Sequence, residues 1–248
     1  MATKKSMWVL FGIYVISAKG RRERNSMGAS VLKFTVASAV ATLLWVIPFG
    51  AFCAAAESYY PLKAGMTWQY QSSSGGSWVV KNLAPRELGG KTVTPQQVGN
   101  DLWFLVEDST GIYDFAKQSS SDIDPQILTT PYYYYVKNPA SLGTNWEEKS
   151  QTTMLMQNVS FLRRCVIEKI DDVITVLAGT FKDCVRIKCT GSTQVPTQFG
   201  GVAEVRAETY NWYAPGVGRV RSITKERSNN LLIGPGGEGS SQLVSFTK

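Results

Sequence analysis

The chain has 248 residues, a formal net charge of +7 and no histidine, with 44% hydrophobic and 11% aromatic residues. This length supports one substantial core or two small ones, and the lack of histidine removes the commonest general base and the usual nitrogen ligand of zinc, copper and iron. Seven basic residues and one acidic residue, Glu23, precede Glu57, so most of the positive charge belongs to the N-terminal segment. The net charge is therefore no evidence for nucleic-acid binding by the rest of the chain.

Residues 1–56 are predicted to form a leader, and residues 57–248 an exported β-domain. Lys33 precedes an uncharged run at residues 34–56, which ends in three alanines. A basic residue, an apolar segment and a small-residue cleavage site are the three parts of a secretory signal peptide. We expect cleavage after Ala56 and export to the periplasm, cell surface or exterior of a bacterium.

A second, shorter apolar run at residues 8–17 precedes the basic segment, which signal peptides do not normally have. This arrangement favours translation from Met27. Residues 1–26 would then be upstream sequence, and residues 27–56 would be the signal peptide.

Two alternatives remain open for the leader. The uncharged run is long enough to span a bilayer, so an uncleaved anchor is one alternative, and membrane contact would then occur only through the leader. Lipidation at Cys53 is the other, although Phe52 stands where a lipobox requires a small residue.

Beyond the leader, short runs of β-branched and aromatic residues alternate with Gly, Pro, Asn, Asp and Ser, and no segment has the apolar spacing of a helix. Short connections cannot make parallel crossovers. The predicted class is therefore mainly β, as a single curved antiparallel sheet that is an open half-barrel or barrel-like. The predicted strands are a hairpin at 68–81, then 91–98, 101–107, 112–118, 132–137, 152–157, 161–170, 173–177, 184–190, 203–213, 218–228 and 242–246, with loops at 119–131 and 192–201 and turns at 171–172 and 234–239.

Three cysteines remain after the predicted cleavage, so at least one thiol is left unpaired within the chain. In a simple meander, the strands of Cys165 and Cys184 lie on either side of residues 173–177, about 10 Å apart. A disulfide needs Cα atoms within about 7 Å, so Cys165 and Cys184 are a candidate pair only if the sheet bends sharply. Alternation places Cys189 with Val185, and we expect Cys189 to be a buried free thiol.

Four consecutive tyrosines, Tyr132, Tyr133, Tyr134 and Tyr135, lie in one predicted strand. Alternate side chains of a strand point to opposite faces, so two are expected in the core and two outward. The outward pair is a candidate exposed aromatic contact surface.

Acidic pairs give no catalytic or metal site by spacing. Asp122 and Asp124 lack the bidentate Glu of a calcium loop, and the adjacent carboxylates of Glu147 and Glu148 diverge in extended chain. We predict no catalytic residue, cofactor or metal ligand.

Three motifs stand out: Y-Y-P-L-x-x-G-x-x-W-x-Y at residues 59–70, L-A-G-T-F-x-x-C at 177–184 and W-Y-A-P-G-V-G at 212–218. They resemble the landmarks of a family of exported bacterial β-rich proteins and lipoproteins of unassigned function. The resemblance implies an open, strongly curved sheet akin to the half-barrels of periplasmic lipoprotein carriers. It supplies no catalytic residues, and Phe52 departs from its lipid-anchored members.

The leading functional hypothesis is a non-enzymatic domain of the cell envelope that binds an apolar or lipid ligand, or an envelope protein, in the concavity of the sheet. The alternative is a structural or assembly component of the bacterial cell surface, with strand edges and aromatics as contacts. A hydrolase that uses carboxylates is the remote alternative.

Overall fold

The computed structural model describes residues 57–152, 159–197, 200–230 and 233–248. The predicted leader and most of the predicted strand 152–157 lie outside them. In the described part of the chain, no helix has the length and hydropathy needed to cross a membrane. The strands are β1 (Thr67–Ser72), β2 (Ser77–Asn82), β3 (Arg86–Leu88), β4 (Lys91–Val98), β5 (Asp101–Asp108), β6 (Gly111–Gln118), β7 (Gln126–Ile127), β8 (Tyr134–Lys137), β9 (Asn145–Gln151), β10 (Ser160–Val176), β11 (Gly179–Pro196), β12 (Val202–Ala214), β13 (Gly218–Ser228) and β14 (Gly236–Thr247).

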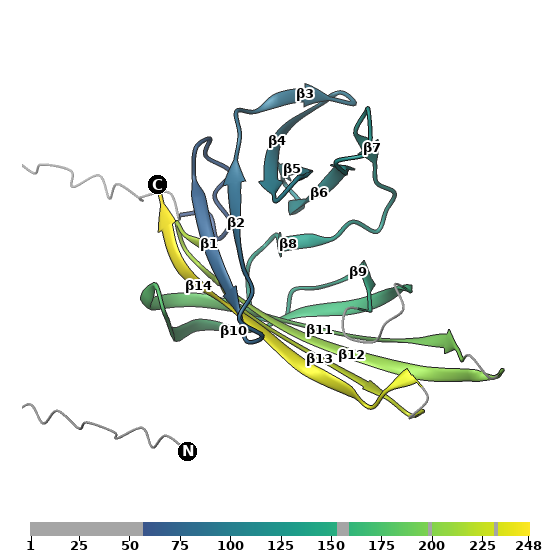
Figure 1. Ribbon diagram of the computed structural model, residues 1–248. Helices are drawn as coiled ribbons and strands as arrows, with labels where there is room; N and C mark the ends of the chain where they lie inside the picture. The colour runs from purple at the N-terminus through teal and green to yellow at the C-terminus, as the bar shows by residue number, and fades with distance from the viewer. Residues whose placement is uncertain (1–56, 153–158, 198–199, 231–232) are drawn as a thin grey trace, which may run out of the picture. The chain divides into compact units, whose positions relative to one another are not determined.

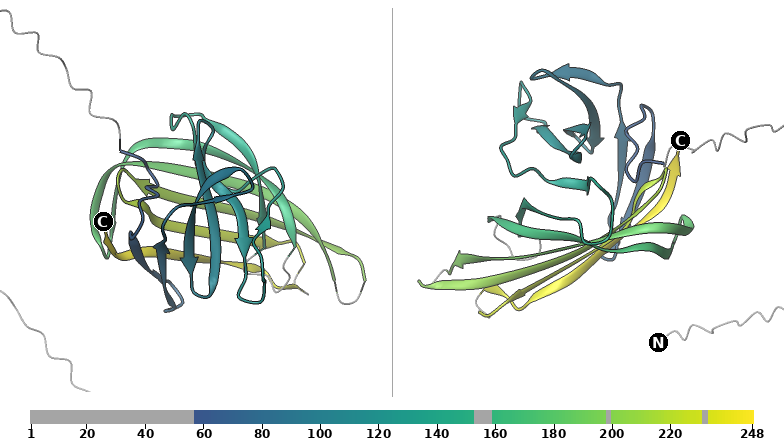
Figure 2. Two further views of the ribbon diagram at one scale, coloured as in Figure 1. Left: turned by 90° about the horizontal axis from the view of Figure 1, so that it is seen from above. Right: turned by 180° about the vertical axis from the view of Figure 1, so that it is seen from behind.

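All these strands belong to one antiparallel sheet, as predicted (Figure 1). Its order is β7-β6-β5-β4-β2-β1-β14-β13-β12-β11-β10-β9, with β3 beside β4 and β8 beside β6. The sheet curves until β8 and β9 lie next to each other, but no strand pairing joins those two among the described residues (Figures 1 and 2). The sheet is therefore not closed. Strands β1–β8 form one half of it and the long strands β10–β14 form the other, and the concave side lies between these two halves.

Most predicted strands form close to their expected bounds, because their alternating apolar residues face a core. The predicted strands 91–98 and 218–228 coincide with β4 and β13, and the hairpin at 68–81 is β1 and β2. β11 continues to Pro196 and β14 begins at Gly236, so the predicted loop at 192–201 and turn at 234–239 are wrong for much of their length. Pairing with β12 and β13 extends these polar and glycine-rich ends as strands.

A single strand, β10, replaces the two predicted strands 161–170 and 173–177. The tight turn expected at Asp171 and Asp172 is wrong. Asp171 has φ of 58° and the register with β11 shifts around Asp172, so the pair forms a bulge. Asp172 is buried and accepts hydrogen bonds from Lys169 Nζ at 2.7 Å and Trp212 Nε1 at 3.0 Å, which hold the bulge in place. The predicted hairpin at 173–189 does form, with its reversal between β10 and β11.

The three landmark motifs meet in one core cluster. Trp68, Cys184, Trp212 and Val217 share this cluster with residues such as Leu243 of β14. The indole of Trp68 donates a hydrogen bond to the Val217 carbonyl, across 149 positions of sequence. Gly218 has φ of 104°, and a Cβ there would lie 3.4 Å from that indole. The three motifs therefore pack together where β1, β11, β12 and β13 meet.

Candidate functional site

The concave face of the sheet holds a cavity of about 550 Å³. Its wall combines tyrosines, two tryptophans and aliphatic side chains with a few charged groups. Small-molecule sites in proteins have volumes of this order and mostly apolar walls with few polar groups. The lining residues are Tyr60, Tyr70, Trp78, Val80, Gln96, Val98, Trp103, Asp114, Lys117, Leu128, Thr129, Pro131, Tyr132, Tyr133, Tyr135, Lys149, Ser150, Gln151, Ser160 and Arg219.

A second depression, of about 800 Å³, lies over β11, β12 and β13 and has a different character. None of its described lining residues is aromatic, and most of its charged groups are paired, as in the ion pairs of Arg206 with Glu204 at 3.0 Å and of Lys225 with Glu238 at 3.3 Å. It therefore offers no aromatic wall for a ligand, and the concave cavity is the better candidate site.

Arg219 enters the cavity from β13, directly after the landmark turn that carries Gly218. The hydroxyl of Tyr70 donates a hydrogen bond to the Arg219 carbonyl at 2.9 Å, and the guanidinium lies 5.4 Å from the Tyr70 ring centroid. Arg219 takes part in none of the ion pairs among the described residues. The contact between β1 and β13 thus places at the cavity a guanidinium that has no carboxylate partner among the described residues.

Asp114 lines the cavity from β6 and is only 5% exposed. Burial raises the pKa of its carboxyl to about 7, and the nearby charge of Glu148 acts in the same direction, while a hydrogen bond from Tyr135 and the charge of Arg219 oppose the rise. Its Oδ1 atom has no hydrogen-bond partner in the structure. A buried carboxyl with an unused oxygen is costly, and such groups concentrate at functional sites.

Tyr60 is fixed at the cavity wall by a chain of buried hydrogen bonds. Its hydroxyl donates to Gln96 Oε1 at 3.0 Å, and Gln96 Nε2 donates to Asn82 Oδ1 at 2.9 Å. Asn82 in turn donates to the carbonyls of Pro61 and Lys63 at 3.2 and 3.3 Å. The first landmark motif is thereby connected to β2 and β4, and burial raises the Tyr60 pKa, so its hydroxyl stays protonated.

The tyrosine run alternates as predicted, but none of its four side chains is exposed. Tyr132 and Tyr134 lie 4.8 and 5.2 Å from the Tyr113 ring, whereas Tyr135 stacks on Tyr60 at 4.3 Å. Tyr133 lies 5.3 Å from Tyr135 and also lines the cavity. The predicted outward pair therefore faces the inside of the curved sheet, because β8 lies where the two ends of the sheet approach each other.

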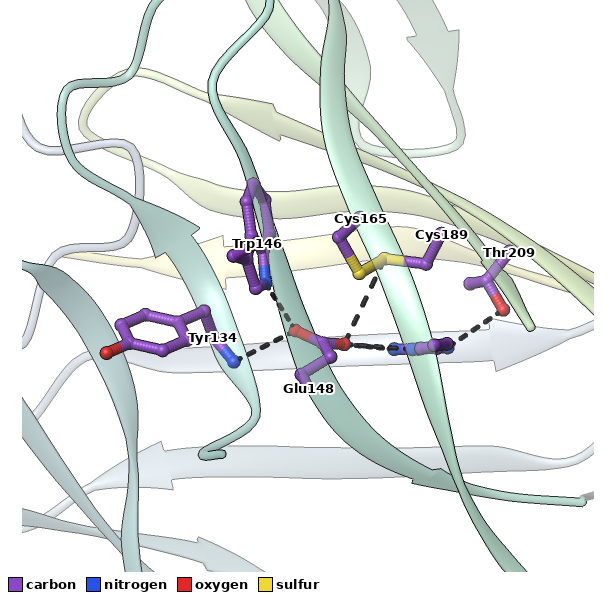
Figure 3. A network of polar contacts seen from close by, with 7 residues as sticks. Tyr134, Trp146, Glu148, Cys165, Cys189 and Thr209 are labelled. Carbon is purple, nitrogen blue, oxygen red and sulfur yellow. Dashed lines mark hydrogen bonds and ion pairs between the residues drawn. A yellow bond between two sulfur atoms is a disulfide. The ribbon is translucent and has the colours of Figure 1, made fainter. Parts of the chain in front are cut away.

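A buried network around Glu148 bridges the unpaired seam between β8 and β9 (Figure 3). Glu148 Oε2 accepts hydrogen bonds from the Tyr134 backbone N–H at 3.2 Å and from Trp146 Nε1 at 2.7 Å. Its Oε1 accepts two from Arg163 of β10, at 2.9 and 2.7 Å, and Arg163 also donates to Thr209 at 3.1 Å. Glu148 is 1% exposed, and both its oxygens are occupied by protein donors, so its role here is to join the ends of the sheet.

The disulfide joins Cys165 to Cys189, so the candidate pairing of Cys165 with Cys184 is wrong (Figure 3). β10 and β11 are direct neighbours because β10 continues through the bulge, and the two cysteines face each other with Cα atoms 4.0 Å apart. Cys189 does share its core cluster with Val185 and Ile187, but it is not the free thiol. Cys184 is free and buried, and burial raises its pKa to about 11, which keeps the thiol protonated and unreactive.

Peptide mapping tests this assignment. Digestion of the unreduced protein with thiols blocked should give one linked pair of peptides that contain Cys165 and Cys189. A linked pair that contains Cys184 would contradict the assignment, and reduction before blocking is the control.

Glu148, Cys165 and Cys189 are the one cluster of metal-ligand type in the described residues, with atoms within 4.8 Å of one another. Cys189 Sγ lies 3.9 Å from Glu148 Oε1. Since both sulfur atoms are shared in the disulfide, neither offers a thiolate, and we assign no metal to this cluster.

Residues 124–233 match the model of the DUF3108-like family. The matched segment contains the second and third landmark motifs, Glu148 and Arg219, and it leaves out the first landmark and Asp114. No curated protein sequence matches the chain.

Two solved structures are similar to the chain at low scores. One is a candidate lipoprotein from Parabacteroides distasonis, with 14% identity and a TM-score of 0.37 over 77% of this chain and 99% of that chain. The other is a candidate exported protein with a YmcC-like fold from Bacteroides fragilis, with 13% identity and a TM-score of 0.36 over 77% of this chain and 100% of that chain. Because both TM-scores are low, the reasons for a function come from the cavity itself.

The charged residues of the cavity and seam were not found from the sequence. Asp114, Glu148 and Arg163 occupy buried positions in strands, where alternation leads one to expect apolar residues. One signal could have indicated these residues: a charged residue at an alternating position where an apolar residue is expected. Glu148, two residues after Trp146, is an example.

Proposed function

We propose that this protein is a non-enzymatic binding protein of the bacterial cell envelope that holds an apolar or amphiphilic ligand in the concave cavity. The observation that carries the proposal is the aromatic wall of a cavity of about 550 Å³ on the inner face of the sheet. Trp78, Trp103 and Val98 line it while half-buried, so they keep apolar surface that a ligand would remove from water.

The surroundings of the cavity favour binding over catalysis. Asp114 is the one carboxylate among the described lining residues of the cavity. Both oxygens of Glu148 already accept hydrogen bonds in the seam between β8 and β9. Acid–base hydrolysis by carboxylates needs two such groups with separate roles. The predicted signal peptide supports a place in the cell envelope.

The test combines identification of bound lipid with thermal shifts. Protein purified from its native compartment is expected to release an amphiphile on organic extraction, detected by mass spectrometry. Added long-chain ligand at 100 times its Kd should stabilise the fold by about 2.7 kcal/mol. A sample that carries no lipid and whose Tm is unchanged by long-chain carboxylates, alcohols and phospholipids would refute the proposal.

Filling the cavity should abolish this binding. Val98 lines the cavity and is half-buried, so Val98→Trp is expected to weaken ligand affinity at least tenfold without unfolding the protein. Val79 of β2 is 50% exposed and does not line the cavity, so Val79→Trp is the matched control. Isothermal titration of both variants gives the comparison, and equal affinities would place the ligand elsewhere.

A further inference from the structure

Three observations about charge in the cavity limit which ligand it fits. Asp114, Lys117, Lys149 and Arg219 are the charged residues in its lining. Lys117 pairs with Asp101 at 3.4 Å, whereas Lys149 donates only to Thr129, at 2.6 and 3.3 Å. Two cationic groups of the lining, Lys149 and Arg219, therefore have no carboxylate partner among the described residues.

The two unpaired cations differ in position. Lys149 is exposed, and Arg219 is half-buried and surrounded by the tyrosines that line the inner wall. A positive group at an exposed edge attracts anions, and a guanidinium in a low-dielectric cavity holds them in fixed geometry. Arginine stays protonated at any pH at which the protein is folded.

We propose that the ligand is a long-chain carboxylic acid whose carboxylate binds the guanidinium of Arg219. This rests on the proposed function and names the ligand class of the same cavity. One guanidinium balances one negative charge, and its parallel N–H groups match the two oxygens of a carboxylate. A dianionic phosphate would need the exposed Lys149 as a second counter-ion, whereas a carboxylate needs Arg219 alone.

Asp114 fits this ligand when it is protonated. Burial raises its pKa to about 7, so near neutral pH a large fraction of the carboxyl carries its proton. A neutral Asp114 neither repels an incoming carboxylate nor competes with it for the guanidinium of Arg219.

The remaining wall suits a hydrocarbon chain. Trp78 stacks on Tyr70 with ring centroids 5.5 Å apart, and Arg219 lies over the same Tyr70 ring. Val80 of β2 and Val98 of β4 extend this apolar surface. The acidic head group and the apolar chain therefore have adjacent places in one cavity.

The test compares hexadecanoate with hexadecanol, which has the same chain and no charge. We expect Arg219→Met to lower the affinity for hexadecanoate by about 10- to 100-fold and to leave the affinity for hexadecanol unchanged, as measured by isothermal titration. Arg221→Met is the matched control, because Arg221 lies on the same strand, has its guanidinium 5.7 Å from the Trp212 ring centroid and does not line the cavity. Arg219→Lys, which keeps the charge, should lose less than Arg219→Met and covers the case in which Arg219→Met fails to fold.

The outcomes separate this inference from the proposed function. Equal binding of both compounds by the wild-type protein, or no loss in either Arg219 variant, overturns the carboxylate assignment and leaves a ligand-binding protein. Tighter binding of hexadecyl phosphate than of hexadecanoate also overturns it. If no long-chain compound binds, both the inference and the proposed function fail.

Discussion

Replacing Glu148 with alanine is expected to lower the free energy of unfolding by about 3–5 kcal/mol, because it leaves a buried guanidinium without its counter-ion. Arg163 is 7% exposed and makes both of its shortest hydrogen bonds to Glu148. The same change removes the acceptor of Trp146 Nε1 and of the Tyr134 N–H across the seam. Urea unfolding followed by tryptophan fluorescence measures the loss as a lower midpoint.

The neighbouring ion pair is a matched control for this prediction. Glu147 and Arg164 occupy the next register positions on β9 and β10 and interact at 3.3 Å, but their side chains are 58% and 74% exposed. Glu147→Ala should therefore cost about 0–1 kcal/mol. Adding Arg163→Met to Glu148→Ala should recover part of the stability, since the unpaired charge is then gone. A loss in Glu148→Ala no larger than in Glu147→Ala would refute the seam's role.

Replacing Asp114 with asparagine is expected to stabilise the ligand-free protein at pH 8 by roughly 2–4 kcal/mol and to change little at pH 4. The pKa of Asp114 rises from an ordinary value of 3.8 to about 7 on folding. Between these values the folded protein retains a proton that the unfolded chain has released, so stability falls as pH rises, by up to about 1.4 kcal/mol per unit. Well above pH 7 the loss of stability caused by the buried, ionised carboxylate no longer changes with pH. Asparagine does not ionise, so the variant does not have this loss.

The groups that face Asp114 come from three other strands: Tyr135 of β8, Glu148 of β9 and Arg219 of β13. Urea unfolding of the wild type and Asp114→Asn from pH 4 to pH 8.5 gives the difference directly. Asp101→Asn, which removes a half-exposed partner of Lys117, should shift stability by less than about 1 kcal/mol at either end. A pH-independent effect of Asp114→Asn would show that the carboxyl is not a buried acid.

Local patterns predicted most of this sheet because hydrophobic alternation and turn residues act over a few positions. β4 and β13 illustrate this, since each has β-favouring residues between clear turn signals. β9 was not predicted, because one of its two core-facing side chains is the carboxylate of Glu148. Glutamate is usually found at the surface, so the apolar alternation of a half-buried strand is missing there.

The disulfide shows how one local error changes a distant assignment. Two adjacent aspartates have the composition of a turn, but hydrogen bonds from Lys169 and Trp212 let Asp172 sit buried in a bulged strand instead. A turn there would separate Cys165 from Cys189 by one strand, whereas the bulge makes them neighbours. One of these donors, Trp212, lies on β12, 40 positions away in the sequence, so local spacing could not decide between a turn and a bulge.

The sequence by itself determined the antiparallel β class, the approximate strands and the three landmark motifs, because these depend on neighbours along the chain. Only the tertiary structure decided what the motifs do: the hydrogen bond of Trp68 to Val217 fixes the turn before Arg219, which lines one cavity with Asp114 and the tyrosine run. These groups come from segments separated by up to about 150 residues, and they meet through the curvature of the sheet. Curvature results from the sum of twist and bulges over many strands, which no single stretch of sequence specifies.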